Sequence, residues 1–419
     1  SFPSSQMTSL LYFSDPIGPP KTSAGDLPTL WMRARMKDDP GREGLTTQGT
    51  AATIDLTNTF GGLPTRNFQQ GQFEEAENLN GNAIKDTRLV ANKACFACTI
   101  ACGRVCRLEE HSDKFMVNMH PRNWKQAGEG PEYEAAWALG AATGVDDLDA
   151  LTFANFICNE QGIDPISFGA TVGAAMEMYE TGILTKKKTG GIALNFGSAE
   201  ALTELAELTG TGEGFGAEIG LGSKLLCEKY ECPELSMQVK GQEFPAYDSR
   251  GIQGMGLGYA TANRGACHLR SYTVASEVLG IPEKTDPLVT DGKAGLVMAF
   301  QDATAVVDSA GICLFTTFAW GMDDIAPQID AACEGDWSVD NLMKVGERVW
   351  NLERKYNLAA GFTSKDDTLP KRLLKDATKI GPAKGLTAGL DKMLPEYYQL
   401  RGWSKDGVPS NETLSRLAL

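Results

Sequence analysis

The chain contains one stretch that decides its class, Cys95-Phe96-Ala97-Cys98-Thr99-Ile100-Ala101-Cys102. Three thiolates at this C-x2-C-x3-C spacing can bind one side of a metal cluster, and a distant fourth thiolate can complete the ligand set. A second stretch, Asp308-Ser309-Ala310-Gly311-Ile312-Cys313, supplies such a thiol far along the chain. The pattern therefore predicts redox chemistry.

Other readings of the cysteines remain open. S-adenosylmethionine radical enzymes have the reverse spacing, which disfavours that class. Zinc prefers paired C-x2-C hooks or Cys/His sets, and the chain has no second C-x2-C, so a structural zinc site ranks second. Cys106 would share a face with Cys102 if a helix ran through both, and ranks below Cys313 as the fourth ligand. The remaining cysteines stand alone and are expected to be small core residues: Cys158, Cys227, Cys232, Cys267 and Cys333.

Composition narrows the classes of partner and compartment. The 419 residues are enough for two or three domains, and a formal net charge of -15 argues against a nucleic-acid or anionic-membrane surface. Four of the ten cysteines lie between Cys95 and Cys106, which favours metal binding in a reducing compartment over disulfide pairing. No run of about 18 apolar residues and no signal peptide is visible. We expect a cytoplasmic protein whose first residue, Ser1, is not the natural start.

Apolar residues recur at three- and four-residue spacing along most of the chain, which predicts a mostly α fold. The expected helices are 134–144, 146–161, 167–180, 199–208, 218–230, 292–310, 339–356 and 388–400. A break at Glu231-Cys232-Pro233-Glu234 predicts a domain boundary near residue 235. We expect an irregular segment over 1–48, a domain with the cysteine stretch over 49–235 and a second helical domain over 236–419.

A glycine-rich stretch from Asp248 to Arg270 follows this boundary. Its glycines allow a ligand to approach the backbone closely, and Arg264, His268 and Arg270 provide donors suited to phosphate or oxyanion groups. The pattern predicts a cradle for a polar ligand, although a glycine-rich turn with surface arginines remains the plainer alternative. His268 is one of only three histidines, and packing alone explains it poorly in this setting.

Two acids, Glu132 and Glu134, lie at the start of an expected helix in Gly130-Pro131-Glu132-Tyr133-Glu134. The helix dipole favours acids at this end, which is a sufficient explanation for one of them. The other is a candidate for proton transfer in a pocket.

Six stretches, in this order, together resemble the aldehyde:ferredoxin oxidoreductase family. They are Gly62-Leu63-Pro64-Thr65-Arg66-Asn67-Phe68, the cysteine stretch through Gly103-Arg104, Gly130 to Glu134, Asp164-Pro165-Ile166-Ser167-Phe168-Gly169, Gly256-Leu257-Gly258-Tyr259-Ala260 through His268, and Asp308 to Cys313. They cover the chain from about Gly49 to its C-terminus. The resemblance implies two helical domains, with the family's N-terminal sheet domain, which covers the cofactor, absent from this chain.

The resemblance further implies a tungsten, or less often molybdenum, bis-pterin centre beside one [4Fe-4S] cluster. The residues that match the family's ligands and contacts are Cys95, Cys98, Cys102 and Cys313 for the cluster, and Asp164, Ser167, Gly169, Asp308, Gly311 and Ile312 for the pterins. Arg264 and Gly265 of the glycine-rich stretch are expected to be further cofactor contacts. Glu134 and His268 match the acid/base pair near the metal, with Glu132 and Tyr133 as weaker candidates.

The implied function is interconversion of aldehydes and carboxylic acids in an anaerobic setting. Electrons would pass through the cluster to ferredoxin or a polyferredoxin-like electron-transfer subunit. The expected assembly is an oligomer that includes the missing N-terminal domain or a subunit in its place. A reductase of aromatic-ring thioesters from the same family, and a non-catalytic iron-sulfur subunit, remain alternatives. The stretch between Cys106 and Gly130, with His111, His120 and Trp124, matches no motif; it is expected to shape the pocket or to contact a partner.

Overall fold

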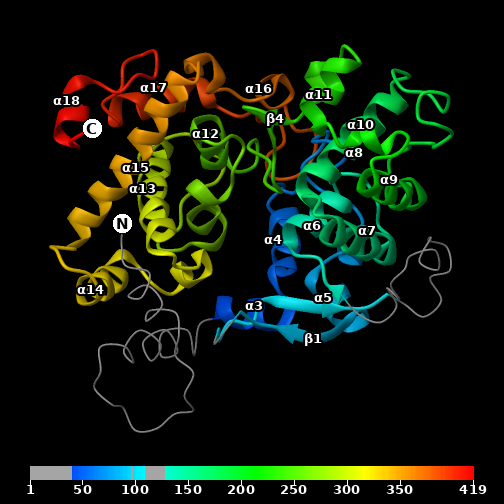
Figure 1. The fold of residues 1–419 in the computed structure, drawn as a ribbon, viewed down its shortest axis with the longest axis horizontal. Coiled ribbons are helices and arrows are strands. Elements are labelled where there is room, and N and C mark those ends of the chain that lie inside the picture. The colour runs from blue at the N-terminus through cyan, green and yellow to red at the C-terminus, as the bar shows by residue number, and fades with distance from the viewer. Residues whose placement is uncertain (1–39, 96–97, 109–127) are drawn as a thin grey trace, which may run out of the picture.

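The computed structural model describes residues 40–95, 98–108 and 128–419. These residues form a mostly α structure with two small antiparallel sheets, which confirms the predicted fold class (Figure 1). The predicted irregular segment up to residue 39, and the stretch with His111, His120 and Trp124, lie outside the described residues. No helix in the described part of the chain is both long and apolar enough to cross a membrane.

The helices fall into two groups, which Figure 1 shows side by side. The first group comprises α3 (Pro40–Gln48), α4 (Thr53–Thr59), α5 (Gly81–Thr87), α6 (Tyr133–Leu139), α7 (Leu148–Gln161), α8 (Pro165–Glu180), α9 (Ala199–Thr211), α10 (Gly216–Ile219) and α11 (Gly222–Lys229). The second group comprises α12 (Gln253–Thr261), α13 (Lys293–Ala310), α14 (Met322–Ala332), α15 (Val339–Ala359), α16 (Lys371–Lys375), α17 (Leu390–Leu400) and α18 (Asn411–Arg416).

Two small sheets complete the fold. Strands β1 (Leu89–Lys93), β2 (Gly103–Cys106) and β3 (Gly128–Glu129) form an antiparallel sheet in that order. Strands β4 (Gln238–Val239) and β5 (Gln242–Glu243) form a hairpin between the two groups of helices. The first two strands flank the cysteine stretch, because β1 ends at Lys93, before Cys95, and β2 begins at the residue after Cys102.

Three sequence predictions of local structure were wrong. The segment expected to be irregular up to residue 48 contains α3. The helix expected over 134–144 ends at Leu139, and the helix expected over 218–230 is divided between α10 and α11. The second division has a local cause, since Gly222 takes the left-handed backbone conformation with φ 79°.

Helix boundaries elsewhere follow ordinary capping chemistry. The Asp147 side chain accepts bonds from two main-chain N–H groups of α7, and the Asp164 side chain accepts one from Ile166 at the start of α8, where Pro165 is the first helical residue. Helix α13 ends at Gly311, which is left-handed with φ 70°.

A continuous core runs through both groups of helices. Phe68 lies against Trp137 and Phe244, with ring centroids 6.0 and 5.5 Å apart, and Phe244 meets Tyr259 at 4.9 Å. A buried ion pair between Arg372 and Glu177, 2.6 Å long, also joins the two sides. The division of the chain at residue 235 stays a prediction.

Candidate functional site

Glu134 and His268 lie against each other in the folded chain, although they are far apart in the sequence. Glu134 is in the first turn of α6, and His268 immediately precedes the 3₁₀ helix Leu269–Ser271. The His268 Nε2 atom is 3.5 Å from the Glu134 Oε1 atom, and the two side chains are 17% and 16% exposed. The other carboxylate oxygen of Glu134 accepts a 2.9 Å bond from the main-chain N–H of Ala246.

Burial changes the protonation of both members of this pair. It raises the pKa of Glu134 to about 8, and the bond from Ala246 offsets only part of that shift. Burial, helped by the charge of Arg264, lowers the pKa of His268 to about 3. At neutral pH the imidazole is therefore uncharged and the carboxyl group holds a proton. Such a pair can donate a hydrogen bond and exchange a proton while neither side chain carries a charge.

Tyrosines that the sequence analysis did not single out surround His268. The rings of Tyr247 and Tyr272 lie 5.8 and 6.3 Å from the imidazole, and their hydroxyl groups are 3.0 Å apart. Tyr133, a weaker candidate, is buried with its hydroxyl group donating to the Ala246 carbonyl, 2.7 Å away. Tyr247 and Tyr272 had no sequence signal, because only the folded chain brings them to the histidine.

The cysteine stretch forms a second candidate site. Cys95 is exposed, Cys98 and Cys102 are half-buried, and the Cys98 N–H donates a 3.1 Å bond to the Cys95 carbonyl. Cys313 is exposed and begins the 3₁₀ helix Leu314–Phe318. Phe315 and Phe318 of that helix pack with Cys98 and Cys102 on a small apolar cluster centred on Leu45 and Ile100.

Charge interactions support this grouping of the thiols. Burial raises the pKa of Cys102 to about 11, and the charges of Glu132, Cys313 and Cys98 act in the same direction. Burial also raises the pKa of Cys313, with Cys98 and Cys95 among its charged neighbours. The fold thus brings the four predicted cluster ligands into one neighbourhood.

The same thiols do not form a site for a single metal ion. Within the described ranges, no group of three His, Cys, Asp or Glu side chains could hold one. Four thiolates can bind either a structural zinc ion or an iron-sulfur cluster, so the cluster stays a prediction.

Cys106 stands apart from this set. The helix that would have placed it beside Cys102 does not exist, because residues 103–106 form β2 and pair with β1. Cys106 is fully buried in the main core, whereas Cys98 and Cys102 pack on the separate small cluster.

The first Asp-containing motif begins α8. Asp164 is exposed, and the Ser167 hydroxyl donates to it at 3.0 Å, while Glu243 also lies 3.0 Å from that hydroxyl. Gly169 packs on α6, where an added Cβ would come within 2.2 Å of the Ala138 carbonyl oxygen. Helix packing therefore requires a glycine here, whatever else the residue contacts.

The second motif ends α13. The Asp308 carboxylate is half exposed and lies 3.8 Å from the Arg270 guanidinium group. Gly311 provides the left-handed turn that ends the helix, and Ile312 packs on an apolar cluster with Trp320. The cofactor roles of both motifs stay predictions.

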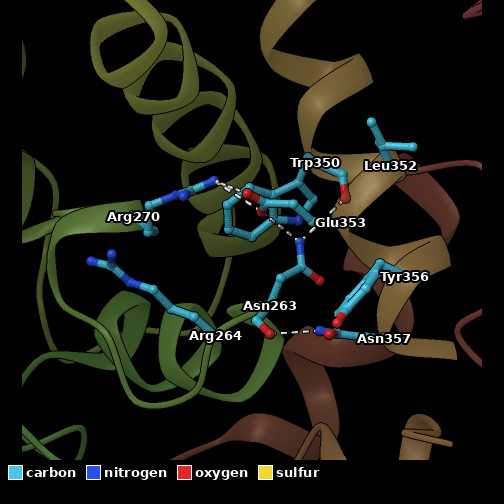
Figure 2. A pocket seen from close by; sticks show the side chains of 8 residues that line it. All are labelled: Asn263, Arg264, Arg270, Trp350, Leu352, Glu353, Tyr356 and Asn357. Atoms are coloured by element: carbon cyan, nitrogen blue, oxygen red, sulfur yellow. Dashed lines mark hydrogen bonds and ion pairs between the residues drawn. The ribbon is translucent and has the colours of Figure 1, made fainter. Parts of the chain in front are cut away.

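A pocket of about 370 Å³ lies between the predicted cradle and α15. Figure 2 shows Arg264 and Arg270 on the cradle side and Trp350, Glu353, Tyr356 and Asn357 on the helix side. Arg270 donates to both carboxylate oxygens of Glu353 at 2.9 Å and lies over the Trp350 ring.

The backbone of the cradle is shaped by Gly265. Its φ is 109°, and an added Cβ would come within 2.7 Å of the Val239 carbonyl oxygen. The Arg264 side chain is exposed, and its guanidinium group donates to the Cys267 sulfur at 2.7 Å. The arrangement suits an anionic or polar ligand, and the assignment of Arg264 and Gly265 to a cofactor stays a prediction.

Comparison with known proteins gives a consistent family. Residues 29–419 match the family model described as "Aldehyde ferredoxin oxidoreductase, domains 2 & 3". A "Tungsten-containing aldehyde ferredoxin oxidoreductase" of Pyrococcus furiosus is 44% identical over 389 residues, which are 92% of this chain and 62% of that protein. The protein of the same name from Thermococcus kodakarensis is 43% identical, again over 92% of this chain and 62% of its own length. The chain therefore spans about 62% of the length of these relatives.

Two more distant matches, one by sequence and one by fold, were also found. The "Aliphatic sulfonate oxidoreductase, WOR-like subunit" of Pyrococcus furiosus is 25% identical, with 85% of this chain and 55% of that protein covered. A solved structure, "Active site complex BamBC of Benzoyl Coenzyme A reductase in complex with 1,5 Dienoyl-CoA", matches with a TM-score of 0.70 and 15% identity, over 94% of this chain and 65% of that one. At that identity the likeness shows a shared fold.

Proposed function

Because the chain belongs to the aldehyde ferredoxin oxidoreductase family, we propose that it forms the catalytic part of an enzyme that oxidises aldehydes to carboxylic acids. An aldehyde and water give the acid, two protons and two electrons, and ferredoxin or a polyferredoxin-like subunit accepts the electrons one at a time. The observation that carries the proposal is the buried contact between Glu134 and His268. A subunit that only conducted electrons would need the cysteines and would have no use for this pair.

The donor groups fit the cofactors that the relatives' names suggest. Cys95, Cys98, Cys102 and Cys313 would hold the [4Fe-4S] cluster, and the charge interactions among these four thiols support this set. The exposed carboxylates of Asp164 and Asp308 can accept bonds from pterin N–H groups. When bound, a tungsten or molybdenum bis-pterin centre supplies two-electron chemistry and the cluster passes those electrons on singly.

The remaining residues of the two Asp motifs, Ser167, Gly169, Gly311 and Ile312, would approach the pterins from the start of α8 and the end of α13. Arg264 and Gly265 would contact the cofactor from the cradle, where Gly265 leaves the backbone uncovered by a side chain. The matching family model is named for domains 2 and 3. We propose that a further domain or a second subunit covers the side of the pterins that these residues do not contact.

The pKa values of Glu134 and His268 suggest a different role for each residue. His268 is uncharged at neutral pH and would donate an N–H bond to the substrate oxygen. Glu134, with a pKa of about 8, is well matched to accept the proton that leaves the hydrated aldehyde. In the reverse direction, reduction of an acid, protonated Glu134 would return the proton while His268 keeps its bond to the substrate oxygen.

The exposed thiols bear on the redox conditions under which the protein would work. Cys95 and Cys313 are exposed, so oxidants can reach these thiols when no metal holds them. We therefore extend the proposal to a reducing, anaerobic cytoplasm.

The proposal is tested on the anaerobically purified full-length holoenzyme by metal analysis, acid-labile sulfide and aldehyde oxidation with a viologen acceptor. We expect tungsten or molybdenum together with iron and sulfide. Glu134→Gln should keep these metals and lose roughly a hundredfold or more in turnover. The matched control is Glu200→Gln, the same change at an exposed first-turn position of α9. Zinc as the sole metal, or full activity of Glu134→Gln, would contradict the proposal.

The alternative is reduction of an aromatic-ring thioester. The solved benzoyl coenzyme A reductase structure has the same fold as this chain. The 44% identical relatives are all named for aldehyde oxidation. An aromatic thioester assayed beside the aldehydes separates the two reactions, and turnover of the thioester alone would favour the alternative.

A further inference from the structure

Arg104 is a buried cation directly beneath the cysteine stretch. It is 2% exposed and follows Cys102 by two residues, at the second position of β2. Its charge interacts with Cys102, Cys106 and Glu132. Burial lowers the pKa of Arg104, yet a guanidinium group remains protonated in proteins, so the positive charge is permanent.

The guanidinium group fixes the backbone on both sides of Cys102. One terminal nitrogen donates to the carbonyls of Ala101 and Gly103 at 3.0 and 2.8 Å. Ala101 is left-handed with φ 50°, a conformation that a non-glycine residue adopts at a cost. The two bonds hold that strained turn, and with it the direction of the Cys102 side chain.

The other terminal nitrogen joins this loop to α3. It donates to the carbonyls of Leu45 and Thr46 in the last turn of the helix, at 2.6 and 3.0 Å. The Leu45 carbonyl also accepts from the Gly49 N–H, and the Thr46 carbonyl from the Asn92 side chain. The negative end of the helix dipole also favours a cation there.

The third nitrogen of the Arg104 guanidinium group has no hydrogen-bond partner among the described residues. This nitrogen, Nε, is buried. Gly49, with φ 69°, covers it closely, since a Cβ there would come within 3.1 Å of both Nε and the Cys102 carbonyl oxygen. The charge is thus only partly satisfied and is shielded from water on a side next to Cys102.

The surroundings of the charge are apolar on the cysteine side. Leu45 and Ile100 are 9% and 1% exposed, and Cys98, Cys102 and Phe315 pack on them. In such a low-dielectric region a fixed charge acts on its neighbours far more strongly than an exposed charge does. Reduction of an iron-sulfur cluster adds one negative charge at this place, which a buried cation stabilises.

We infer that Arg104 is a positioning and tuning residue for the [4Fe-4S] cluster, raising its reduction potential by its buried charge while its fork holds the Cys102 turn. The inference rests on the proposed function, because it requires the cluster. It assigns to Arg104 a role separate from that of the ligands, since the potential can change while all four thiolates remain.

The test is an EPR-monitored redox titration of the anaerobically purified full-length holoenzyme, with iron and sulfide measured in each variant. Arg104→Gln removes the charge but keeps a polar side chain, and Arg104→Lys keeps the charge but removes the fork. Arg104→Gln should make cluster reduction roughly tenfold less favourable, a fall of about 59 mV for a one-electron couple. Arg104→Lys should stay closer to the wild-type potential.

Lys93→Met is the matched control. Lys93 pairs with Gly103 across the sheet and interacts with Cys95, but its side chain is 52% exposed. Water and salt screen an exposed charge, so this variant should keep the wild-type potential.

Some outcomes would overturn the inference. A wild-type potential in Arg104→Gln with full iron content would reduce Arg104 to a structural clamp, and so would loss of the cluster from both Arg104 variants. Loss of iron from Arg104→Gln alone would also overturn it, because the residue would then act on cluster retention and not on the potential. Absence of iron and sulfide from the wild-type protein would instead refute the proposed function.

Discussion

The acid/base pair and the predicted cluster ligands differ in how far the folded chain buries their side chains. Glu134 and His268 lie in well-packed surroundings, mostly buried, with their contact already formed. Of the four predicted cluster ligands, Cys95 and Cys313 are exposed and only Cys98 and Cys102 are half-buried. The first site is thus organised by packing, whereas the second leaves two of its four thiols exposed.

Aromatic side chains connect the two regions. Tyr272, beside His268, lies 6.4 Å from the Phe318 ring, and Phe318 lies 5.7 Å from Phe315 on the small cluster that packs with Cys98 and Cys102. The two sites are neighbours, but changes at one should affect different properties from changes at the other. Variants can therefore separate iron content from turnover.

The largest effect is expected at the cysteine stretch. Cys313→Ala removes the distant ligand and should lose most of the cluster iron and, with it, electron delivery to the acceptor. Cys106→Ala, a cysteine buried in the main core, should keep its iron. Iron and sulfide analysis of both variants measures this, and equal losses from the two would remove Cys313 from the ligand set.

His268→Ala should show the opposite pattern. It leaves every thiol in place, so iron and tungsten or molybdenum should remain at wild-type levels. Loss of the N–H donor should lower turnover by roughly a hundredfold to ten thousandfold. Steady-state kinetics with metal analysis on the same preparation checks this. Wild-type turnover would mean that the histidine only packs against Tyr247 and Tyr272.

The pH dependence of kcat/KM should report the same pair. Glu134 must be deprotonated to accept a proton, and burial raises its pKa to about 8. The rate should therefore rise with pH up to about 8 and level off above it. His268, with a pKa of about 3, should add no second limb near neutral pH. A profile that is flat from acidic pH through 8 would show that Glu134 is not the base.

Local sequence signals predicted α7, α8 and α13 well, because an apolar period coincides with caps such as Asp164 and Gly311. The break at Gly222 also had a local signal, two nearby glycines, which the apolar period masked. The strand at residues 103–106, which the sequence analysis did not predict, was missed for another reason. Strand β2 exists because β1 pairs with it, and no pattern within β2 reveals that partner.

In the candidate sites, too, local motifs were visible in the sequence and distant contacts were not. The motifs marked Glu134, His268 and the cysteines, but their surroundings come from distant parts of the chain. Arg104 stood within a quoted motif without a role, because its carbonyl partners in α3 are 58 and 59 residues away. Glu353, which holds Arg270, is 83 residues from it. Such contacts have no signature in a single sequence.

The smallest expected effect separates helix packing from cofactor contact at Gly169. A methyl group there would meet the Ala138 carbonyl of α6, the helix that carries Glu134, so Gly169→Ala should cost about 1–3 kcal/mol of unfolding free energy. Gly220→Ala is the control, since its φ of -60° and nearest contacts near 3.5 Å accept a side chain. Denaturation of both variants measures the difference. Because the strain acts on α6 and leaves the cysteine stretch alone, Gly169→Ala should lower turnover with its iron retained. Loss of tungsten or molybdenum at unchanged stability would instead identify Gly169 as a cofactor contact.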